Sequence, residues 1–261
     1  MRPASPAEVR DRTRRHYDER PFGFDQPEIL EEKLDRRLMG EAIRATQERD
    51  LVLDVGCGAA RVARLVARTG GARSIGLDLS MQSLRDARRR TSSPLVQGDN
   101  LRLPLRSGCA DLVISNGVIH HTPDPAACFR ELARVTKPGG TLVVSVYRRW
   151  GWYFLVWHSV GAFVRALRRL IGDSGLRVTV FPLFHAALQV FLPLATRRRL
   201  FVPVETSWNL FHDQFTTPCI SFHSFSELRR WAAEAGLSCE AARPEAARQL
   251  ATVRLRRRTT A

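Results

Sequence analysis

The chain has 261 residues, of which 44% are hydrophobic and 26% are charged, so it can bury a globular core and is not a disordered protein. Its formal net charge is +15, and Lys33 and Lys137 are the only lysines among its 41 basic residues. The five cysteines form no C-x-x-C pair, which excludes a zinc ribbon and a disulfide framework and predicts reduced thiols in a cytoplasmic protein. The charged first residues are unlike a secretory signal peptide.

Helices and short strands alternate along the first part of the chain. Two charged helices are predicted over residues 5–20 and 27–48. Five short apolar strands follow, at residues 51–55, 74–77, 94–97, 112–115 and 141–146. Helices are predicted between them, among them 79–90 with Ser80 as its N-cap and 126–135. Such alternation indicates an α/β fold with a parallel, doubly wound sheet.

The alternation stops after residue 147 and resumes at Ser224, which has Glu227 at the capping-box position. A helix to Gly236 and two strands, near 237–243 and 249–256, complete the sheet. The intervening segment is rich in Trp, Phe, Leu and Arg and is expected to be mostly helical. We therefore predict an N-terminal helical cover (1–48), a core (49–147 and 223–261) and an inserted lid that binds the substrate (148–222).

Gly56 and Gly58 lie between the first strand and a helix, as in a nucleotide-binding turn. Arg61 stands where a dinucleotide fingerprint has its third glycine. Asp54, which comes just before this turn, would repel a pyrophosphate and attract a ligand that carries ammonium and sulfonium groups. The loop therefore favours S-adenosylmethionine over NAD, although a tight turn with a capping aspartate also explains these residues.

Two further carboxylates follow the second and third strands. Asp78 can accept hydrogen bonds from both hydroxyls of a ribose, or it can cap the helix after Ser80. Asp99, in the Gly-Asp-Asn sequence, can accept from an adenine amino group, or it can belong to a simple turn. Because ligands of such folds bind at the carboxyl edge of the sheet, three carboxylates at three successive strand ends predict a binding site there.

Five segments carry a resemblance to a known family, and they are LVLDVGCGAARVA (51–63), SIGLDLS (74–80), GDNLRLPL (98–105), DLVISNGVIHHTPDP (111–125) and ELARVTKPGGTLVVSVY (131–147). In order and spacing they resemble the motifs of class I S-adenosylmethionine-dependent methyltransferases of the small-molecule, methyltransferase-11-like type. The resemblance implies a Rossmann-like seven-stranded sheet of order 3-2-1-4-5-7-6, with helices on both faces and an antiparallel seventh strand. The helical insertion then follows strand 5.

The resemblance also implies roles for single residues. The cofactor contacts that it implies are Asp54 with Gly56 and Gly58 for the methionine amine, Asp78 for the ribose, Leu79 and Asp99 with the Asn100 amide for the adenine, and Asn116 beside the methionine moiety. Ala60 departs from the glycine that many members carry at its position. The product would be S-adenosylhomocysteine, and no metal is expected.

Methyl transfer from a sulfonium mainly requires alignment of the reacting atoms, and a base is needed only if the acceptor arrives protonated. His121, which can instead be structural, and His212 beside Asp213 are the candidate bases. Tyr17 is a candidate to close over the cofactor. Trp208 and Phe211, together with His212, are expected to line an apolar acceptor pocket formed by the insertion.

The expected acceptor is a small apolar or aromatic metabolite, as in enzymes of secondary metabolism or quinone tailoring. The charge leaves an RNA methyltransferase as an alternative, since residues 148–200 carry nine arginines against one acid and residues 248–261 carry five against none. A non-catalytic protein of the same fold is a third reading. Arginines beside apolar runs in the insertion also suggest peripheral contact with a membrane, but no membrane-spanning segment is predicted at 176–195.

Overall fold

The computed structural model describes residues 4–21, 37–69, 71–196 and 201–259. In this part of the chain seven strands form one sheet of order β3-β2-β1-β4-β5-β7-β6, which confirms the predicted order. The strands are β1 (Leu51–Val55), β2 (Arg73–Asp78), β3 (Leu95–Gln97), β4 (Ala110–Asn116), β5 (Thr136–Tyr147), β6 (Leu237–Glu245) and β7 (Leu250–Arg257). Strands β1 to β5 run parallel, and β7 pairs antiparallel with β5 and β6.

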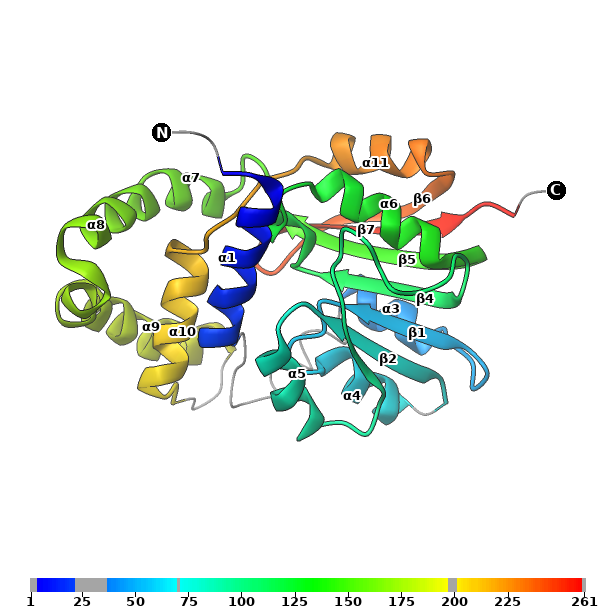
Figure 1. Cartoon of the computed structure of the whole chain (residues 1–261), viewed down its shortest axis with the longest axis horizontal. Helices are drawn as coiled ribbons and strands as arrows, with labels where there is room; N and C mark the ends of the chain where they lie inside the picture. The colour runs from blue at the N-terminus through cyan, green and yellow to red at the C-terminus, as the bar shows by residue number, and fades with distance from the viewer. Residues whose placement is uncertain (1–3, 22–36, 70, 197–200, 260–261) are drawn as a thin grey trace.

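Helices cover both faces of the sheet (Figure 1). One face is covered by α3 (Leu38–Arg44), α4 (Arg61–Thr69) and α5 (Met81–Arg88), and the other by α6 (Pro125–Val135) and α11 (Phe225–Glu234). Strand β1 is covered on both faces, which explains why its sequence does not alternate between apolar and polar residues. Val52 packs into the core on the side of α3 and α4, whereas Leu53 and Val55 pack against α6 and its neighbours on the opposite face.

Capping residues set the ends of several helices where the sequence predicted them. The Ser80 side chain accepts from the Ser83 amide at the start of α5. Ser224 and Glu227 form both hydrogen bonds of a capping box at the start of α11. Of the second predicted helix, 27–48, residues 27–36 lie outside the described part of the chain. Helix α3 ends at Arg44, so the prediction that the helix continues to residue 48 was wrong.

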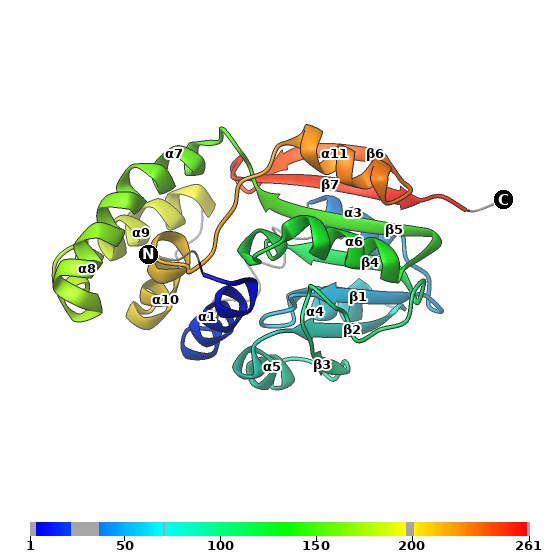
Figure 2. The same ribbon diagram turned by 45° about the horizontal axis from the view of Figure 1, so that its top comes forward.

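The segment after β5 is helical, as expected, and lies beyond the carboxyl ends of the parallel strands (Figures 1 and 2). It consists of α7 (Trp152–His158), α8 (Val160–Val178), α9 (Phe181–Thr196) and α10 (Val204–Phe215). A kink at Gly172, where φ is 67°, divides α8. The N-terminal helix α1 (Pro6–Glu19) lies between these helices and the sheet. None of the described helices is long and apolar enough to cross a membrane.

Candidate cofactor and acceptor site

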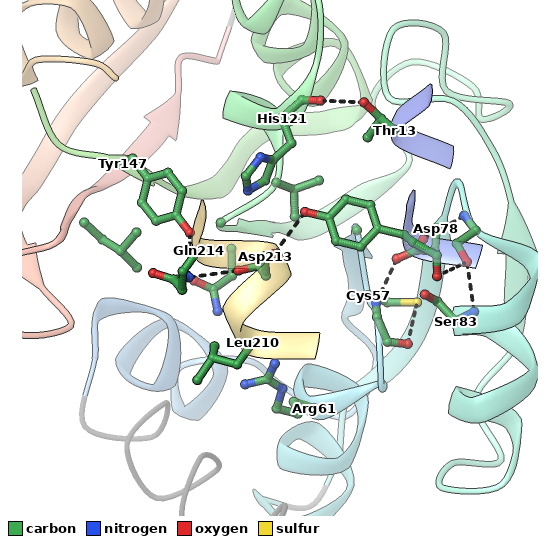
Figure 3. A pocket seen from close by; sticks show the side chains of 18 of the residues that line it. Thr13, Cys57, Arg61, Asp78, Ser83, His121, Tyr147, Leu210, Asp213 and Gln214 are labelled. Carbon is green, nitrogen blue, oxygen red and sulfur yellow. Dashed lines mark hydrogen bonds between the residues drawn. The ribbon is translucent and has the colours of Figure 1, made fainter. Parts of the chain in front are cut away.

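A cavity of about 560 Å³ lies at the carboxyl ends of β1, β2 and β4, bounded by α1 and by the helical insertion (Figure 3). Seven of the eight predicted cofactor residues line it, and they are Asp54, Gly56, Gly58, Asp78, Leu79, Asn100 and Asn116. The parallel strands bring these residues together because their carboxyl ends meet at one edge of the sheet.

The glycine turn after β1 is held close to β2. The amides of Gly56 and Cys57 both donate to the carbonyl of Leu77, at 2.7 and 2.9 Å. Gly56 has φ of 81°, and a Cβ there would lie 2.3 Å from a methyl carbon of Val118, so no other residue fits. Ala60 is buried with φ of 58°, so this departure from glycine places an alanine in the left-handed region.

Asp78 fastens the glycine turn and faces the cavity at the same time. Its two carboxylate oxygens accept from the amides of Gly58 and Ser80, each at 2.9 Å. Burial raises the pKa of Asp78, and the backbone hydrogen bonds from Ser80 and Gly58 oppose that rise. Since each carboxylate oxygen has a further lone pair, the local structural role and a ribose contact are compatible.

Asp54 is a buried carboxylate at the end of β1, with 3% of its surface exposed. Burial, and then the charge of Asp78, raise its pKa to about 7, while the guanidinium of Arg61 lowers it. Ionisation of such a buried carboxyl group is unfavourable by itself, and a cation beside it makes the ionised form favourable. The position of Asp54 in the cavity wall therefore fits the ammonium group of an amino acid.

Asn100 and Asp99 differ in position although they are neighbours in sequence. The side-chain oxygen of Asn100 is buried in the cavity wall and has no hydrogen-bond partner among the described residues, so it is free to accept from a ligand. Asp99 lies instead at a smaller neighbouring hollow that shares Leu79 with the cavity. There it accepts from the Leu101 amide at 2.9 Å and pairs with Arg10 of α1 at 3.4 Å.

The two adjacent histidines after β4 have different partners. Buried His120 accepts the Tyr147 amide through Nδ1, at 3.2 Å, which is a structural contact. His121 lines the cavity, and its Nδ1 lies 2.9 Å from the carbonyl oxygen of Cys219. A carbonyl only accepts, so Nδ1 of His121 carries the proton and Nε2 keeps a lone pair. Burial lowers the pKa of His121, which favours this neutral form.

A chain of hydrogen bonds joins α1, α10 and the sheet around His121 (Figure 3). The Tyr17 hydroxyl donates to Asp213 at 3.2 Å, and the Gln214 amide donates to Asp213 at 2.9 Å and to Tyr147 at 3.3 Å. The rings of Tyr17 and Tyr147 lie 6.1 and 5.6 Å from that of His121. Gln214, which the sequence did not single out, and Asp213, which was named only as the neighbour of His212, therefore form part of the wall together with the predicted Tyr17.

The insertion completes the cavity with apolar side chains, although Trp208 and Phe211 are not among them. Those that line it are Trp152 of α7, Phe184, Leu188 and Phe191 of α9 and Leu210 of α10. Trp208 and Phe211 do not line it, because they pack with Phe181 and Phe215 in the core of the helical insertion. His212 is also buried outside the cavity wall, with Nδ1 2.6 Å from the Thr216 hydroxyl.

The helical period of α10 explains this difference. Residues 208, 211, 212 and 215 follow the i, i+3, i+4, i+7 spacing of one helix face, and this face packs inside the insertion. Leu210, Asp213 and Gln214 lie on another face, which borders the cavity. The aromatic spacing was therefore a signal of packing between helices, and the polar pair after His212 marked the face toward the cavity.

Comparison with known proteins agrees with this fold. Residues 53–144 match the model of a methyltransferase domain. The malonyl-[acyl-carrier protein] O-methyltransferase of a Marinomonas species is 36% identical over 140 residues, which cover 52% of this chain and 48% of that protein. The demethylmenaquinone methyltransferase of Mycolicibacterium vanbaalenii is 37% identical over 112 residues, or 43% of this chain and 48% of that protein. The chain thus spans less than half the length of these curated relatives.

Among solved structures, the magnesium protoporphyrin IX methyltransferase of Synechocystis with bound S-adenosylhomocysteine has a TM-score of 0.56 at 16% identity, over 95% of this chain and 93% of that one. At this identity the likeness concerns the fold. Residues 53–144 therefore match a methyltransferase domain, and the sheet has the order that the resemblance to class I S-adenosylmethionine-dependent methyltransferases implied. The cavity wall fits that cofactor, since a buried carboxylate and an unpartnered amide oxygen face the same cavity.

Proposed function

We propose that the chain transfers a methyl group from S-adenosylmethionine to a small apolar or aromatic metabolite. The observation that carries this proposal is one continuous cavity, which extends from the carboxylates at the strand ends to the apolar side chains of the helical insertion. Asp54 and Asp78 lie in the wall near the sheet, and Phe184, Leu188 and Leu210 lie in the wall near the insertion. A pocket of this kind holds a polar, positively charged cofactor beside an apolar acceptor.

Asp54 would hold the methionine ammonium, Asp78 the ribose hydroxyls, and Leu79 and Asn100 the adenine side of the cofactor. Gly56 and Gly58 allow the backbone to approach, and Asn116 borders the methionine end. Asp99 would bind the amino group of the adenine only after its ion pair with Arg10 has rearranged. When bound, S-adenosylmethionine supplies a methyl group on a cationic sulfur, so the protein chiefly has to orient the acceptor.

His121 is our candidate for the base. Its unprotonated Nε2 belongs to a ring in the cavity wall, between Tyr17 and Tyr147, and its Nδ1–H is oriented by the Cys219 carbonyl. The ring can therefore accept a proton from a hydroxyl or phenol, and the nearby Asp213 carboxylate stabilises the charged imidazolium that results. Tyr17 and Asp213 would close the pocket over the acceptor through their hydrogen bond.

Arginine contacts favour a small acceptor over RNA. Arg257, in the basic C-terminal segment, donates to the carbonyls of Ala133 and Arg134 at the end of α6, at 2.9 and 3.0 Å. Arg254 pairs with Glu41 and Glu240. These guanidinium groups already have partners within the chain, so they are poor candidates for phosphate contacts.

The experiment is a search for the acceptor. The protein is incubated with methyl-labelled S-adenosylmethionine and a metabolite extract, and products heavier by one methyl group are identified by mass spectrometry. We expect a small apolar product and stoichiometric S-adenosylhomocysteine. Methylation of added RNA, with no small labelled product, would contradict the proposal.

With the acceptor in hand, His121→Gln should lower kcat by about 10²-fold or more, as loss of a general base does. The deficit should shrink as pH rises and the acceptor ionises without help. His158→Gln is the matched control, because His158 is exposed on α7 and does not line the cavity. An unchanged kcat in His121→Gln would show that His121 has only a structural role.

A further inference from the structure

Exposed apolar side chains gather on the helical insertion. The described residues include fifteen large hydrophobic side chains that are exposed, and all of them except Met81 lie between Trp150 and Val204. The sheet and its covering helices therefore have an ordinary polar surface, whereas the insertion does not. A concentration of this kind marks a surface that contacts something other than water.

Helix α9 carries apolar side chains on two adjacent faces. It has no charged residue between Phe181 and Thr196. Phe184 and Leu188 face the cavity, and Leu183, Val190 and Leu194 are 74%, 63% and 72% exposed on the adjacent face. An apolar helix face is normally covered by other parts of the protein. The second face of α9 thus lacks a partner among the described residues.

Helix α8 adds a second apolar face and positive charge. Phe163 and Leu170, one heptad apart, are 63% and 82% exposed. Of the four arginines between Trp152 and Thr196, Arg168 pairs with Asp173 and Arg177 pairs with Glu205 of α10. Arg169 is exposed and makes no ion pair with another described residue. Figures 1 and 2 both place α8 and α9 at the end of the molecule away from the sheet.

We propose that these exposed faces of α8 and α9 bind the surface of a bilayer that contains anionic lipids. Apolar side chains that project from helices with arginines among them match an interface where acyl chains lie beneath negative headgroups. The charge complementarity favours this partner over a second copy of the chain, because two copies would bring the same positive charges together. Neither helix has to cross the bilayer.

The same surface reaches the cavity. Phe191 and Trp152 are 69% and 49% exposed, and both also line the cavity wall. An acceptor dissolved in the bilayer could therefore enter beside these two side chains without crossing water. Entry of the acceptor from the bilayer rests on the proposed function, and it narrows the acceptor class to amphiphiles or lipids. Binding of the protein to the bilayer does not depend on methyl transfer.

The test is sedimentation of the full chain with vesicles, without cofactor or acceptor. Vesicles of phosphatidylcholine alone are compared with vesicles that also contain phosphatidylglycerol. We expect binding to the anionic vesicles that weakens with salt. The combined variant Leu170→Ser/Leu183→Ser/Leu194→Ser should lose at least about tenfold in affinity. Arg169→Gln should lose a few-fold, and only on anionic vesicles, at about 1 kcal/mol for one arginine.

Met81→Ser is the matched control, because Met81 is exposed on the core and should leave vesicle binding unchanged. The thermal midpoint and S-adenosylhomocysteine affinity of each variant show whether it is folded. Quenching of tryptophan fluorescence by brominated lipids tests the native chain directly. The proposal is overturned if the native chain ignores anionic vesicles, or if the triple variant is folded and binds like the native chain. A concentration-dependent dimer that the triple variant abolishes would also overturn it.

Discussion

Replacing Asp54 by asparagine should stabilise the ligand-free protein while it weakens cofactor binding. Asp54 is buried at the end of β1, and burial raises its pKa to about 7 from an ordinary value of 3.8. A carboxyl whose pKa is raised on folding destabilises the folded state as pH rises from the unfolded value through the folded one. Asparagine has nearly the same shape and no charge, so this destabilisation disappears in the variant.

The size of the effect follows from the pKa. A rise from 3.8 to about 7 costs the ionised folded protein about 4 kcal/mol, at about 1.4 kcal/mol for each tenfold change. Relaxation of the cavity and entry of water reduce this cost, so we expect Asp54→Asn to gain about 1–3 kcal/mol above pH 7. The gain should shrink to well under about 1 kcal/mol near pH 4 and approach zero below about pH 3, where both states of the native protein hold the proton.

Urea unfolding of the native protein and of Asp54→Asn from pH 4 to 8 measures this difference. Calorimetric titration with S-adenosylhomocysteine at pH 8 should show a loss of about tenfold or more, as expected for one hydrogen bond to a charged group. A variant that is less stable than the native protein at pH 8, or one that binds the ligand equally well, would refute the reasoning. The first result would mean that Asp54 has a stabilising partner, and the second that it does not touch the ligand.

Substitutions at three further positions, with controls, test other parts of the structure. Asp78→Ala should reduce cofactor affinity at least about tenfold and also lower the thermal midpoint, because the amides of Gly58 in the glycine turn and of Ser80 before α5 each lose a hydrogen bond. An unchanged affinity in titrations of the folded variant would limit Asp78 to capping. Ala60→Gly should change the free energy of unfolding by less than about 1 kcal/mol, because relief of the strain at a left-handed residue offsets the added entropy of the unfolded chain. Ala60→Val should lower the free energy of unfolding, measured in urea, by about 2 kcal/mol or more. Arg257→Gln should lower the free energy of unfolding by about 1–3 kcal/mol and leave cofactor affinity unchanged, because Arg257 donates hydrogen bonds to carbonyls at the end of α6. Arg258→Gln, at an exposed neighbour, is the control. Equal stability of the two variants would contradict this role of Arg257.

Local signals in the sequence were sufficient for much of the fold. The apolar run of β1, the Ser80 cap and the capping box of Ser224 and Glu227 each depend on neighbours within a few residues, and the structure confirms them. The strand order could not be obtained in this way. It came from the resemblance to the family, because pairing of β5 with β7 joins residues more than a hundred positions apart.

The cofactor side of the site was predictable for the same reason. Asp54, Asp78 and Asn100 follow successive strands, and a parallel sheet brings such positions to one edge. Asp99 shows the limit of this argument, because its side chain turns to the neighbouring hollow and to Arg10, a partner 89 residues away. No local pattern in the Gly-Asp-Asn sequence specifies that contact.

The acceptor side was less predictable because it depends on how whole helices are rotated. The composition suggested that the aromatic residues of the insertion form a pocket. Trp208 and Phe211 instead stack on each other and pack against neighbouring side chains between the helices. The rotation of α10 about its axis decides that Leu210 and Gln214 meet the cavity instead. That rotation is set by packing against α8 and α9 and is not encoded in α10 alone.

Calorimetric titration with S-adenosylhomocysteine, with NAD as the comparison ligand, tests most directly whether the cavity is a cofactor site. We expect one S-adenosylhomocysteine to bind per chain, with an affinity that rises as pH increases through about 7, because Asp54 then ionises. NAD should not bind, since its pyrophosphate would meet the carboxylate of Asp54 beside the glycine turn. Binding of NAD with no response to S-adenosylhomocysteine would contradict the account of this site.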